Sequence, residues 1–482
     1  MRILGTVASS SREVPNAPTI GTATNVPSGR AYNNGRADVT FTAPTFDGGL
    51  PITSYTVTSS PGGFTGTGAS SPISVTGLLS STSYTFTVTA TNSRGTSAAS
   101  AASNSITATT VPQAPTIGTA TGGNASATVT YTAGATGGAA VSTYTATATP
   151  GSLTGTGASP ITVSGLTNGT AYTFTVKATN ANGQSLASAA SNSVTPIAPP
   201  TVTGGTLTSD ATYYYRTFTA NGTLTVSGGT LTADCLLVAG GGAASSGKRI
   251  SIDWAPGTGG GAGGLLYSAS RSLNTAYSIA IGAGGVGTIQ NGTPGSNSTG
   301  FTLTAVGGGG GNWAGGGSSG GSGAGGGMYW ETGIGYASGA AGGGAGTSGQ
   351  GNAGGTAYGD NPNGAAAAGG GGAGSAGANA GGATSGNGGS GATYFGTTYA
   401  GGGGGGTPYI FGDNGGTPGS GGSGGGAAGG ARATAGNSAS ANLGGGGGGG
   451  GAPLSGSSGT FTGGSGGSGI VVVRYTRAQV GG

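Results

Sequence analysis

Short segments in which apolar and polar residues alternate make up most of the first 197 residues of the chain. Residues 39–41, 55–57 and 84–88 are examples, and they are rich in threonine, valine and aromatic side chains. Glycine, proline, asparagine and serine separate the segments at the spacing that is typical of short strands in an antiparallel sandwich. The pattern therefore predicts β-strands, each with one face turned toward a core.

The same region contains an internal repeat. VPNAPTIGTA begins at Val14 and VPQAPTIGTA begins at Val111, an offset of 111 − 14 = 97 residues. Tyr84 corresponds to Tyr172 at the smaller offset of 172 − 84 = 88 residues. The first copy therefore carries about nine extra residues (97 − 88), which we expect around residues 25–34.

Both copies resemble fibronectin type III domains, and the resemblance covers about residues 14–197. Leu78-x-x-x-Thr82-x-Tyr84 and its counterpart, which ends at Tyr172, resemble the tyrosine corner of that family. The resemblance implies that each tyrosine hydroxyl bonds back to the backbone while its ring fills the end of the core.

The two copies depart from the family at two places. Phe41 and Tyr131 stand where the family has a tryptophan in strand B, and Ser80 and Asn168 replace the corner proline. Neither change removes the apolar core, and neither copy contains an Arg-Gly-Asp loop. We expect both domains to act as spacers, with weak carbohydrate contact by their surfaces as the alternative.

The segments around the repeat define the remaining domain boundaries. Residues 1–13 resemble no domain, and we expect either an arm that docks into a neighbouring subunit or a disordered tail. A proline-rich break, IAPPTVTGG, follows the second copy and marks a further boundary. The expected domains are residues 14–110, 111–197 and 198–482.

Glycine tracts and short apolar strands alternate in the last domain, which holds most of the 121 glycines. The expected strands are residues 213–218, 222–226, 233–238, 276–281, 301–306 and 470–475. Because apolar strands bracket the tracts, we expect the two ends of this region to meet in one small β-structure. The tracts would then project from that structure as loops.

Polyglycine has a regular way to fold without side chains. Ordering each residue costs about 1–2 kcal/mol of backbone entropy or more, but polyglycine can adopt the polyproline II helix. Such helices approach closely enough to hydrogen-bond to one another, which satisfies their buried backbone groups. Alanine and serine, as in GAAAAGGGG from Gly364, would be tolerated facing outward.

The expected fold class is therefore all-β. Two fibronectin type III-like β-sandwiches precede a small β-structure whose glycine-rich loops pack as polyproline or polyglycine II helices. A disordered glycine-rich segment is the alternative.

The glycine-rich region also resembles a known domain. ADCLLVAGGG, YSIAIGAGGVG and GGSGIVVVRY resemble the glycine-rich domain of bacteriophage tail-fibre and virion proteins, over about residues 218–475. The region is similar to the tail-tip adhesins of T-even-like phages, in which packed polyglycine II helices carry variable host-recognition loops. Those adhesins have a different N-terminal attachment region, so the resemblance implies nothing about how this chain is attached.

Composition argues against several kinds of function. The chain has 482 residues, of which 5% are charged, with a formal net charge of +4 and no histidine. Its 13 basic residues form no cluster, which argues against nucleic acid as a partner. No segment reaches the roughly 18 apolar residues of a membrane span, so we expect no membrane insertion. Cys235, the only cysteine, can form neither an intramolecular disulfide nor a zinc site.

We expect no enzyme, no metal site and no cofactor. Without histidine, acid–base chemistry would fall to 9 scattered carboxylates. Asp253, Glu331, Asp360 and Asp413 could pair as glycosidase carboxylates, but nothing in the sequence fixes two of them at a working distance.

Aromatic islands interrupt the glycine tracts and contain all three tryptophans. Aromatic rings stack on the apolar faces of sugars while nearby carboxylates and amides bind hydroxyls, and the same islands suit the loops of an outer-membrane protein. Rings that plug the ends of the glycine structure are the alternative. The candidate receptor-binding residues are Trp254, Trp313, Tyr329, Trp330, Glu331, Tyr358, Asp360, Tyr394, Phe395, Tyr409, Phe411 and Asp413.

Together these features predict a phage virion structural protein, a tail fibre or adhesin, exposed on the particle. Its glycine-rich head would present aromatic loops to a host glycan or outer-membrane protein, and its N-terminal region would contact other virion proteins. The sequence leaves the oligomeric state open: a homo-oligomer is one option, with a trimer as the common fibre state, and no heptad repeat indicates a coiled coil. A non-enzymatic capsid or tail decoration protein and a bacterial cell-surface adhesin are the alternatives.

Overall fold

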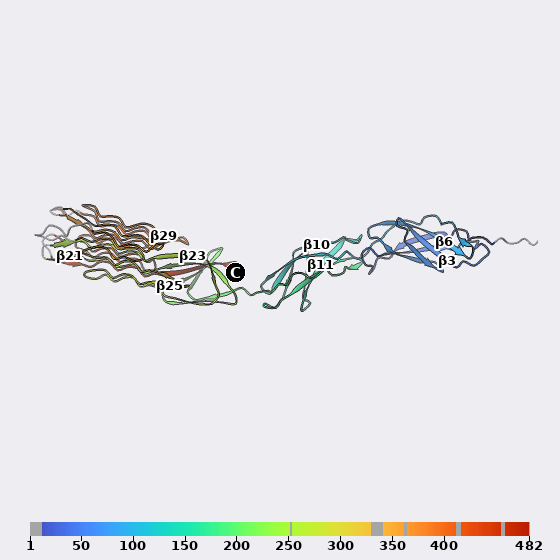
Figure 1. The fold of residues 1–482 in the computed structure, drawn as a ribbon, viewed down its shortest axis with the longest axis horizontal. Coiled ribbons are helices and arrows are strands. Elements are labelled where there is room, and N and C mark those ends of the chain that lie inside the picture. Colours follow the sequence, from blue (N-terminus) through green and yellow to red (C-terminus); the bar gives the residue numbers. More distant parts are fainter. Residues whose placement is uncertain are drawn as a thin grey trace, which may run out of the picture. The chain divides into compact units, whose positions relative to one another are not determined.

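The computed structural model describes residues 12–250, 253–328, 341–360, 364–410, 416–454 and 458–481. The chain divides into two compact units, Met1–Ala198 and Pro199–Gly482 (Figure 1). The described residues are all-β apart from one 3-10 turn, Arg477–Val480. None of their helices is long and apolar enough to cross a membrane.

The first unit begins with a sandwich of two antiparallel sheets. One sheet has the order β1–β2–β5, with bounds Thr19–Asn25, Gly35–Thr42 and Ile73–Leu78. The other has the order β4–β3–β6–β7, with β8 also paired to β6, and bounds Thr65–Gly68, Ser54–Ser60, Ser83–Asn92, Gly95–Thr96 and Ile106–Thr107. Val39, Val57 and Val88 are fully buried between the sheets, which confirms that the alternating segments are strands with one buried face.

The second sandwich repeats this arrangement. One sheet has the order β13–β10–β9, with bounds Ile161–Ser164, Ser126–Thr132 and Thr116–Gly123. The other has the order β12–β11–β14–β15, with bounds Thr154–Thr156, Val141–Thr149, Thr173–Asn180 and Gly183–Gln184. Val129, Val163 and Val176 are fully buried in its core, so the second copy also folds as the predicted sandwich.

The tyrosine corner is present in both sandwiches. The hydroxyl of Tyr84 accepts a hydrogen bond from the backbone N–H of Leu79 at 2.9 Å. The hydroxyl of Tyr172 accepts one from the N–H of Thr167 at 3.1 Å. Both rings are buried, so each tyrosine closes the end of its core and satisfies its own polar group, as the resemblance implied.

The aromatic residues that replace the strand B tryptophan also pack as core residues. Phe41 lies against Tyr55 with ring centroids 4.7 Å apart, and Tyr131 lies against Tyr144 at 4.6 Å. A smaller ring on one sheet therefore pairs with a tyrosine on the other sheet, and the two together fill the core.

The extra residues of the first copy form the loop between β1 and β2. This loop spans residues 26–34, whereas only two residues separate β9 from β10. The N–H of Gly29 donates to the carbonyl of Asn182 at 2.9 Å, and the N–H of Val111 donates to the carbonyl of Arg30 at 3.0 Å. Within this unit, the insertion bonds both to the connector and to the second sandwich.

A ladder of serines completes one sheet in each sandwich, and the sequence analysis missed it. The N–H of Ser100 donates to the carbonyl of Val88 at 3.0 Å, and its Oγ accepts the N–H of Val88 at 3.0 Å. The same Oγ donates to the carbonyl of Ala101 at 2.8 Å. The equivalent serines, spaced three residues apart, are Ser97, Ser103, Ser185, Ser188 and Ser191. Each serine supplies with its side chain the acceptor that a paired strand would supply with its backbone.

The second unit is organised around two framing sheets. The larger has the order β17–β18–β33–β20–β23, with bounds Thr206–Ser209, Tyr213–Phe218, Ile470–Thr476, Leu231–Val238 and Leu265–Leu273. The smaller has the order β16–β19–β24, with bounds Thr201–Thr203, Gly222–Ser227 and Ala276–Ile279. Val238 pairs with Ile470 and Leu237 with Val471, so the two ends of the glycine-rich region meet in one β-structure, as predicted.

One expected strand of this unit is wrong. Residues 301–306 do not form a continuous strand, because Phe301 and Thr302 make the turn between β25 (Ser298–Gly300) and β26 (Leu303–Ala305). Both have positive φ values, of 56° and 62°. The apolar character of Phe301 reflects burial of the turn, since its ring packs on Tyr277 with centroids 5.3 Å apart.

Glycine-rich segments leave the framing sheets as extended rods that bond to one another with a three-residue period. Residues 239–246 form one of the central rods, and all of them are buried. The carbonyl partners of the N–H groups of residues 240–246 are, in order, Ser296, Gly467, Gly261, Thr293, Gly464, Thr258 and Gln290. Every third N–H thus reaches the same neighbour, as expected for polyproline II helices with three residues per turn, and the predicted packing is confirmed.

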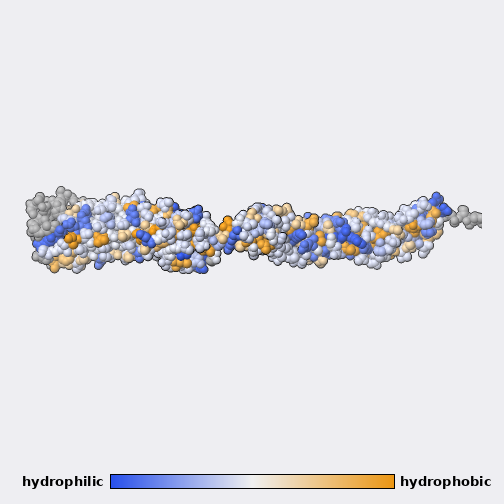
Figure 2. Space-filling model, turned by 90° about the horizontal axis from the view of Figure 1, so that it is seen from below, coloured by the Kyte–Doolittle hydropathy of each residue, from blue (hydrophilic) through white to orange (hydrophobic). Residues whose placement is uncertain are grey.

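The rods, which we call the glycine lattice, are packed too tightly for a side chain at many positions. A Cβ atom on Gly241, Gly242 or Gly403 would overlap a backbone carbonyl of a neighbouring rod. The outward placement of alanine was wrong for the run after Gly364, because Ala366, at the end of strand β28 (Gly364–Ala366), and the next residues Ala367 and Ala368 are all fully buried, so single methyl groups fit inside at these positions. The visible sides of the lattice are mostly neither strongly hydrophilic nor strongly hydrophobic (Figure 2).

Candidate functional site

The glycine lattice has two ends with different structures. At one end, the framing end, lie the two framing sheets, which include β23, and the nearby strand β25 (Figure 1). Strand β21 lies at the opposite end of the same unit (Figure 1). We call that opposite end the distal end. A rod of eight residues, with a rise of about 3.1 Å per residue, is about 25 Å long, and this length separates the two ends.

Two small sheets lie at the distal end. The first has the order β22–β21–β32, with bounds Asp253–Ala255, Gly247–Ile250 and Thr460–Phe461. The second has the order β27–β28–β31, with bounds Tyr358–Asp360, Gly364–Ala366 and Tyr409–Ile410. Strands β22 and β28 are in contact, so the two sheets are neighbours.

The position of these sheets follows from the chain path. The rod of residues 239–246 runs directly into β21, and β22 runs directly into the returning rod of residues 256–264. A segment that is not glycine therefore forms a hairpin where two rods end. Since the rods are parallel or antiparallel to one another, several such turns collect on one surface.

Trp313 lies at this distal end, beside the first small sheet. The ammonium group of Lys248, on β21, lies 5.7 Å from the centroid of its ring. The backbone N–H of Trp313 donates to Oδ1 of Asn291 at 3.2 Å, and the side-chain amide of Asn312 donates to the carbonyl of Gly316 at 3.2 Å. The ring is half-buried, so part of it remains accessible.

Tyr409 belongs to the second small sheet. It is 7% exposed and packs with Ala452, while the guanidinium carbon of Arg432 lies 5.7 Å from its ring centroid. Tyr358, on β27 of the same sheet, is half-buried. Arg432 was missed by the sequence analysis, where the only signal was a lone basic residue inside a glycine and alanine tract, GGARATAG.

Seven other candidates are only partly placed or not placed. Trp254 and Asp360 lie in the distal strands β22 and β27, opposite Arg249 and Gly364 respectively. Five candidates lie outside the described residues: Tyr329, Trp330, Glu331, Phe411 and Asp413. Two of the carboxylates considered for catalysis, at positions 331 and 413, are among these five. Receptor binding by any of the seven stays a prediction.

Tyr394 and Phe395 are separated from the other placed candidates, because their hairpin packs at the framing end. Tyr394 ends strand β29 (Ala392–Tyr394), and Phe395 lies in the turn that leads to β30 (Thr397–Tyr399). The Phe395 ring centroid lies 4.4 Å from the guanidinium carbon of Arg474 and 6.0 Å from the ring of Tyr215. Tyr394 stacks on Tyr267 with centroids 4.7 Å apart. These contacts fit the alternative that some rings close the ends of the lattice.

An ion pair lies in the middle of this framing-end cluster. The guanidinium of Arg474 donates to Oδ2 of Asp234 at 2.6 Å, and the N–H of Ser270 donates to Oδ1 at 3.0 Å. Burial raises the pKa of Asp234, but these two donors outweigh it, so the pKa lies below its ordinary value. Asp234 therefore stays ionised at neutral pH and holds Arg474 in place.

Neither a reactive thiol nor a clustered set of metal ligands is present among the described residues. Cys235 is fully buried in β20, and burial raises the pKa of its thiol to about 12, so the reactive thiolate is scarce at neutral pH. The described part of the chain contains no group of three or more His, Cys, Asp or Glu side chains that could hold a metal ion.

Comparison with known proteins finds two kinds of domain. A family model described as a glycine-rich domain matches residues 216–476, and one described as a fibronectin type III domain matches residues 24–106 and 111–194. Domains of these kinds are typically non-catalytic. No match was found among the curated proteins.

One solved structure, a crystal structure of the chicken CNTN1 FN1–FN3 domains, covers 54% of this chain and 92% of its own at 14% identity. The TM-score is 0.24, so this likeness carries no argument about function.

Proposed function

The chain belongs to the glycine-rich domain family through residues 216–476, and from that membership we propose that it is a tail fibre or adhesin of a bacteriophage virion. In this proposal the glycine lattice is a rigid support, and the distal end contacts a glycan or an outer-membrane protein on the host surface. The N-terminal region contacts other virion proteins, and the two fibronectin type III domains are spacers.

The observation that carries the proposal is the collection of non-glycine segments at the distal end. Segments from four distant parts of the sequence, near residues 250, 313, 360 and 410, lie on that surface. Turns that only reverse the chain could be as short and as glycine-rich as Gly424–Gly425, which lie beside Tyr399 and Leu443 of the framing-end core. Longer aromatic and basic segments at the distal end add chemistry that chain reversal does not need.

The side chains placed there suit surface recognition. Trp313, which is half-buried, lies beside the cation of Lys248, an arrangement that orients an aromatic ring and a charge together. Tyr409 is buried beside Arg432 and supports this surface from within. Aromatic and arginine side chains dominate the energetics of protein interfaces and stack well on sugar rings. A rigid support helps in a further way, because a loop that is already ordered loses less entropy on binding.

The proposal is tested by competition for adsorption. An excess of the purified chain should reduce adsorption of the phage that encodes it. A variant in which residues 249–254 are replaced by glycine and serine should compete roughly tenfold less well, because it lacks a central recognition hairpin. The matched control is Leu207→Ser, which changes an exposed side chain of β17 in the framing sheets and should compete like the native chain.

Two results would overturn the proposal. One is equal competition by the hairpin variant and the control, with both shown to be folded by their melting curves. The other is antibody labelling of intact particles that places the chain along the capsid or tail tube, which would indicate a decoration protein.

A further inference from the structure

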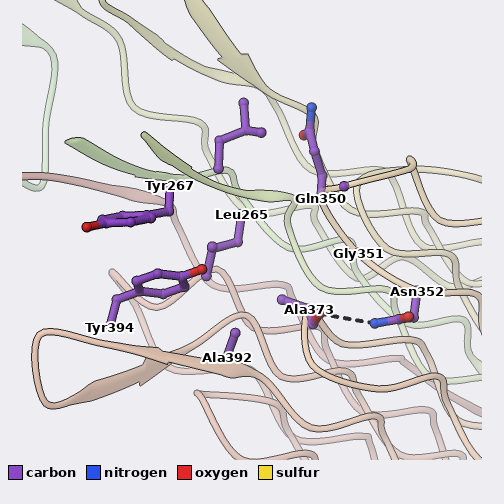
Figure 3. A pocket seen from close by; sticks show the side chains of 10 residues that line it. Leu265, Tyr267, Gln350, Gly351, Asn352, Ala373, Ala392 and Tyr394 are labelled. Atoms are coloured by element: carbon purple, nitrogen blue, oxygen red, sulfur yellow. Dashed lines mark hydrogen bonds between the residues drawn. The ribbon is translucent and has the colours of Figure 1, made fainter. Parts of the chain in front are cut away.

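A pocket of about 370 Å³ lies on the side of the glycine lattice near the framing end, away from the distal surface. Four segments that are separated in the sequence line it (Figure 3). Residues 265–267 come from the start of β23, and residues 392 and 394 come from β29. Residues 349–352 span the end of a turn and the start of the next rod, and Ala373 begins the bend that follows another rod. Its volume lies within the range of about 300–1,000 Å³ that is usual for small-molecule sites.

Two side-chain amides are held in place at this pocket. Nδ2 of Asn352 donates to the carbonyls of Gly372 and Ala373, at 2.9 and 3.1 Å. Oε1 of Gln350 accepts the N–H of Val306 at 2.8 Å. Among the residues that the structure describes, none donates a hydrogen bond to Oδ1 of Asn352, so this oxygen keeps its full capacity as an acceptor.

An aromatic side chain lines the pocket beside these amides. The rings of Tyr394 and Tyr267 are 4.7 Å apart with an angle of 31° between their planes, so each ring holds the other in position. Figure 3 shows the hydroxyl of Tyr394 directed toward the side where Leu265 and Ala373 lie, and the hydroxyl of Tyr267 directed away. No described residue hydrogen-bonds to the Tyr394 hydroxyl.

The lining restricts the chemistry of a ligand. All ten lining residues are uncharged, so an ion would lose hydration without gaining a counter-charge. A hydrocarbon would leave the Asn352 carbonyl oxygen and the Tyr394 hydroxyl without partners. A sugar has hydroxyls for these two groups and C–H faces for the apolar surface of Leu266 and Ala392.

We propose that this pocket binds a neutral sugar residue, with Asn352 and Tyr394 as its hydrogen-bonding groups. Because Asn352 and the stacked tyrosine are fixed before the ligand arrives, binding requires little reordering of side chains. The site is separate from the distal surface, so it stands or falls independently of the proposed function.

The test uses the full chain and a panel of neutral sugars, namely glucose, galactose, N-acetylglucosamine and their disaccharides, with glucuronic acid as the charged comparison. Saturation-transfer NMR at millimolar concentration should detect at least one neutral sugar and give no signal for glucuronic acid. Tyr394→Phe keeps the stacked ring but removes the hydroxyl, and should weaken binding about two- to tenfold. Ala392→Trp fills the pocket and should abolish binding.

The matched control is Tyr277→Phe, the same change in strand β24 of the smaller framing sheet, outside both the pocket lining and the distal end, which should leave sugar binding unchanged. Melting curves followed by tryptophan fluorescence show whether each variant is folded, since all three tryptophans belong to the glycine-rich domain. If no neutral sugar shows saturation transfer from the protein, the proposal is overturned. Binding that survives in folded Ala392→Trp, or that falls equally in Tyr277→Phe, would also overturn it.

Discussion

A single added methyl group should distinguish a packed glycine lattice from a chain that is merely rich in glycine. Gly403 lies in a central rod, where a Cβ atom would stand 2.6 Å from the carbonyl carbon of Gly447. Ordinary contacts begin near 3.4 Å, so the two rods would have to separate by at least 3.4 − 2.6 = 0.8 Å. The obstacle is backbone, which has no alternative rotamer to adopt.

The size of the effect follows from the hydrogen bonds that this movement would disturb. Two bonds that join these two rods run from the N–H of Gly446 to the carbonyl of Gly401 and from the N–H of Gly449 to the carbonyl of Gly404, both at 2.9 Å. Leaving a buried backbone group without a partner costs about 1–3 kcal/mol, so two such losses cost about 2–6 kcal/mol. For a domain of this size, Gly403→Ala should lower the melting temperature by on the order of 10 °C.

The measurement is thermal unfolding of the full chain followed by tryptophan fluorescence. All three tryptophans belong to the glycine-rich domain, so the signal reports that domain and not the two sandwiches. The matched control is Gly342→Ala, because a Cβ atom at Gly342 meets nothing within 4 Å. Its free energy of unfolding should equal that of the native chain or exceed it by up to about 1 kcal/mol, since alanine lowers the entropy of the unfolded state. Equal melting of the two variants would refute the packed lattice.

Two further predictions concern the serine ladder and the framing ion pair. Ser100→Ala removes the acceptor of the buried Val88 N–H, so hydrogen exchange of that amide should become about tenfold faster or more. Ser105→Ala, which removes an exposed hydroxyl, is the control and should not change this exchange rate. Mass spectrometry of the full chain measures exchange in both variants, and equal protection of Val88 would contradict the ladder. The lowered pKa of Asp234 means that its pairing with Arg474 contributes fully above the ordinary Asp pKa of about 3.9 and is lost as the pH falls through the lowered value. Asp234→Asn should therefore melt earlier than the native chain at neutral pH, with a difference that shrinks in acid; a difference that does not depend on pH would contradict the assignment.

The fold of the sandwiches was predictable because its signals are local. Alternation with period two marked the strands, and the repeat aligned Tyr84 with Tyr172, whose hydroxyls both bond to nearby backbone. The serine ladder was not predictable in the same way. Serines three residues apart match neither strand nor helix periodicity, and their role appears only when strand β6 lies beside them.

In the glycine-rich unit, local sequence signals did not predict where several side chains lie. Phe301 was taken for part of a strand because it stands in an apolar run, yet its backbone is a turn and its burial comes from contact with Tyr277. Tyr394 and Tyr409 have similar glycine-rich surroundings in the sequence, but one packs at the framing end and the other at the distal end. Nothing local separates them, because the end reached by a segment depends on the direction of the rod before it.

The sequence by itself determined that this chain is all-β, that it holds two related sandwiches, and that its glycines can pack as three-residue helices. Those conclusions depend on the spacing of apolar residues and on the size of side chains, and both can be read directly from the sequence. The tertiary structure alone decided which rods are neighbours, which islands share the distal surface, and where Asn352 and Tyr394 meet at one pocket. Glycine has no side chain to specify a partner, so the pairing of rods is set by the backbone bonds of the whole lattice together.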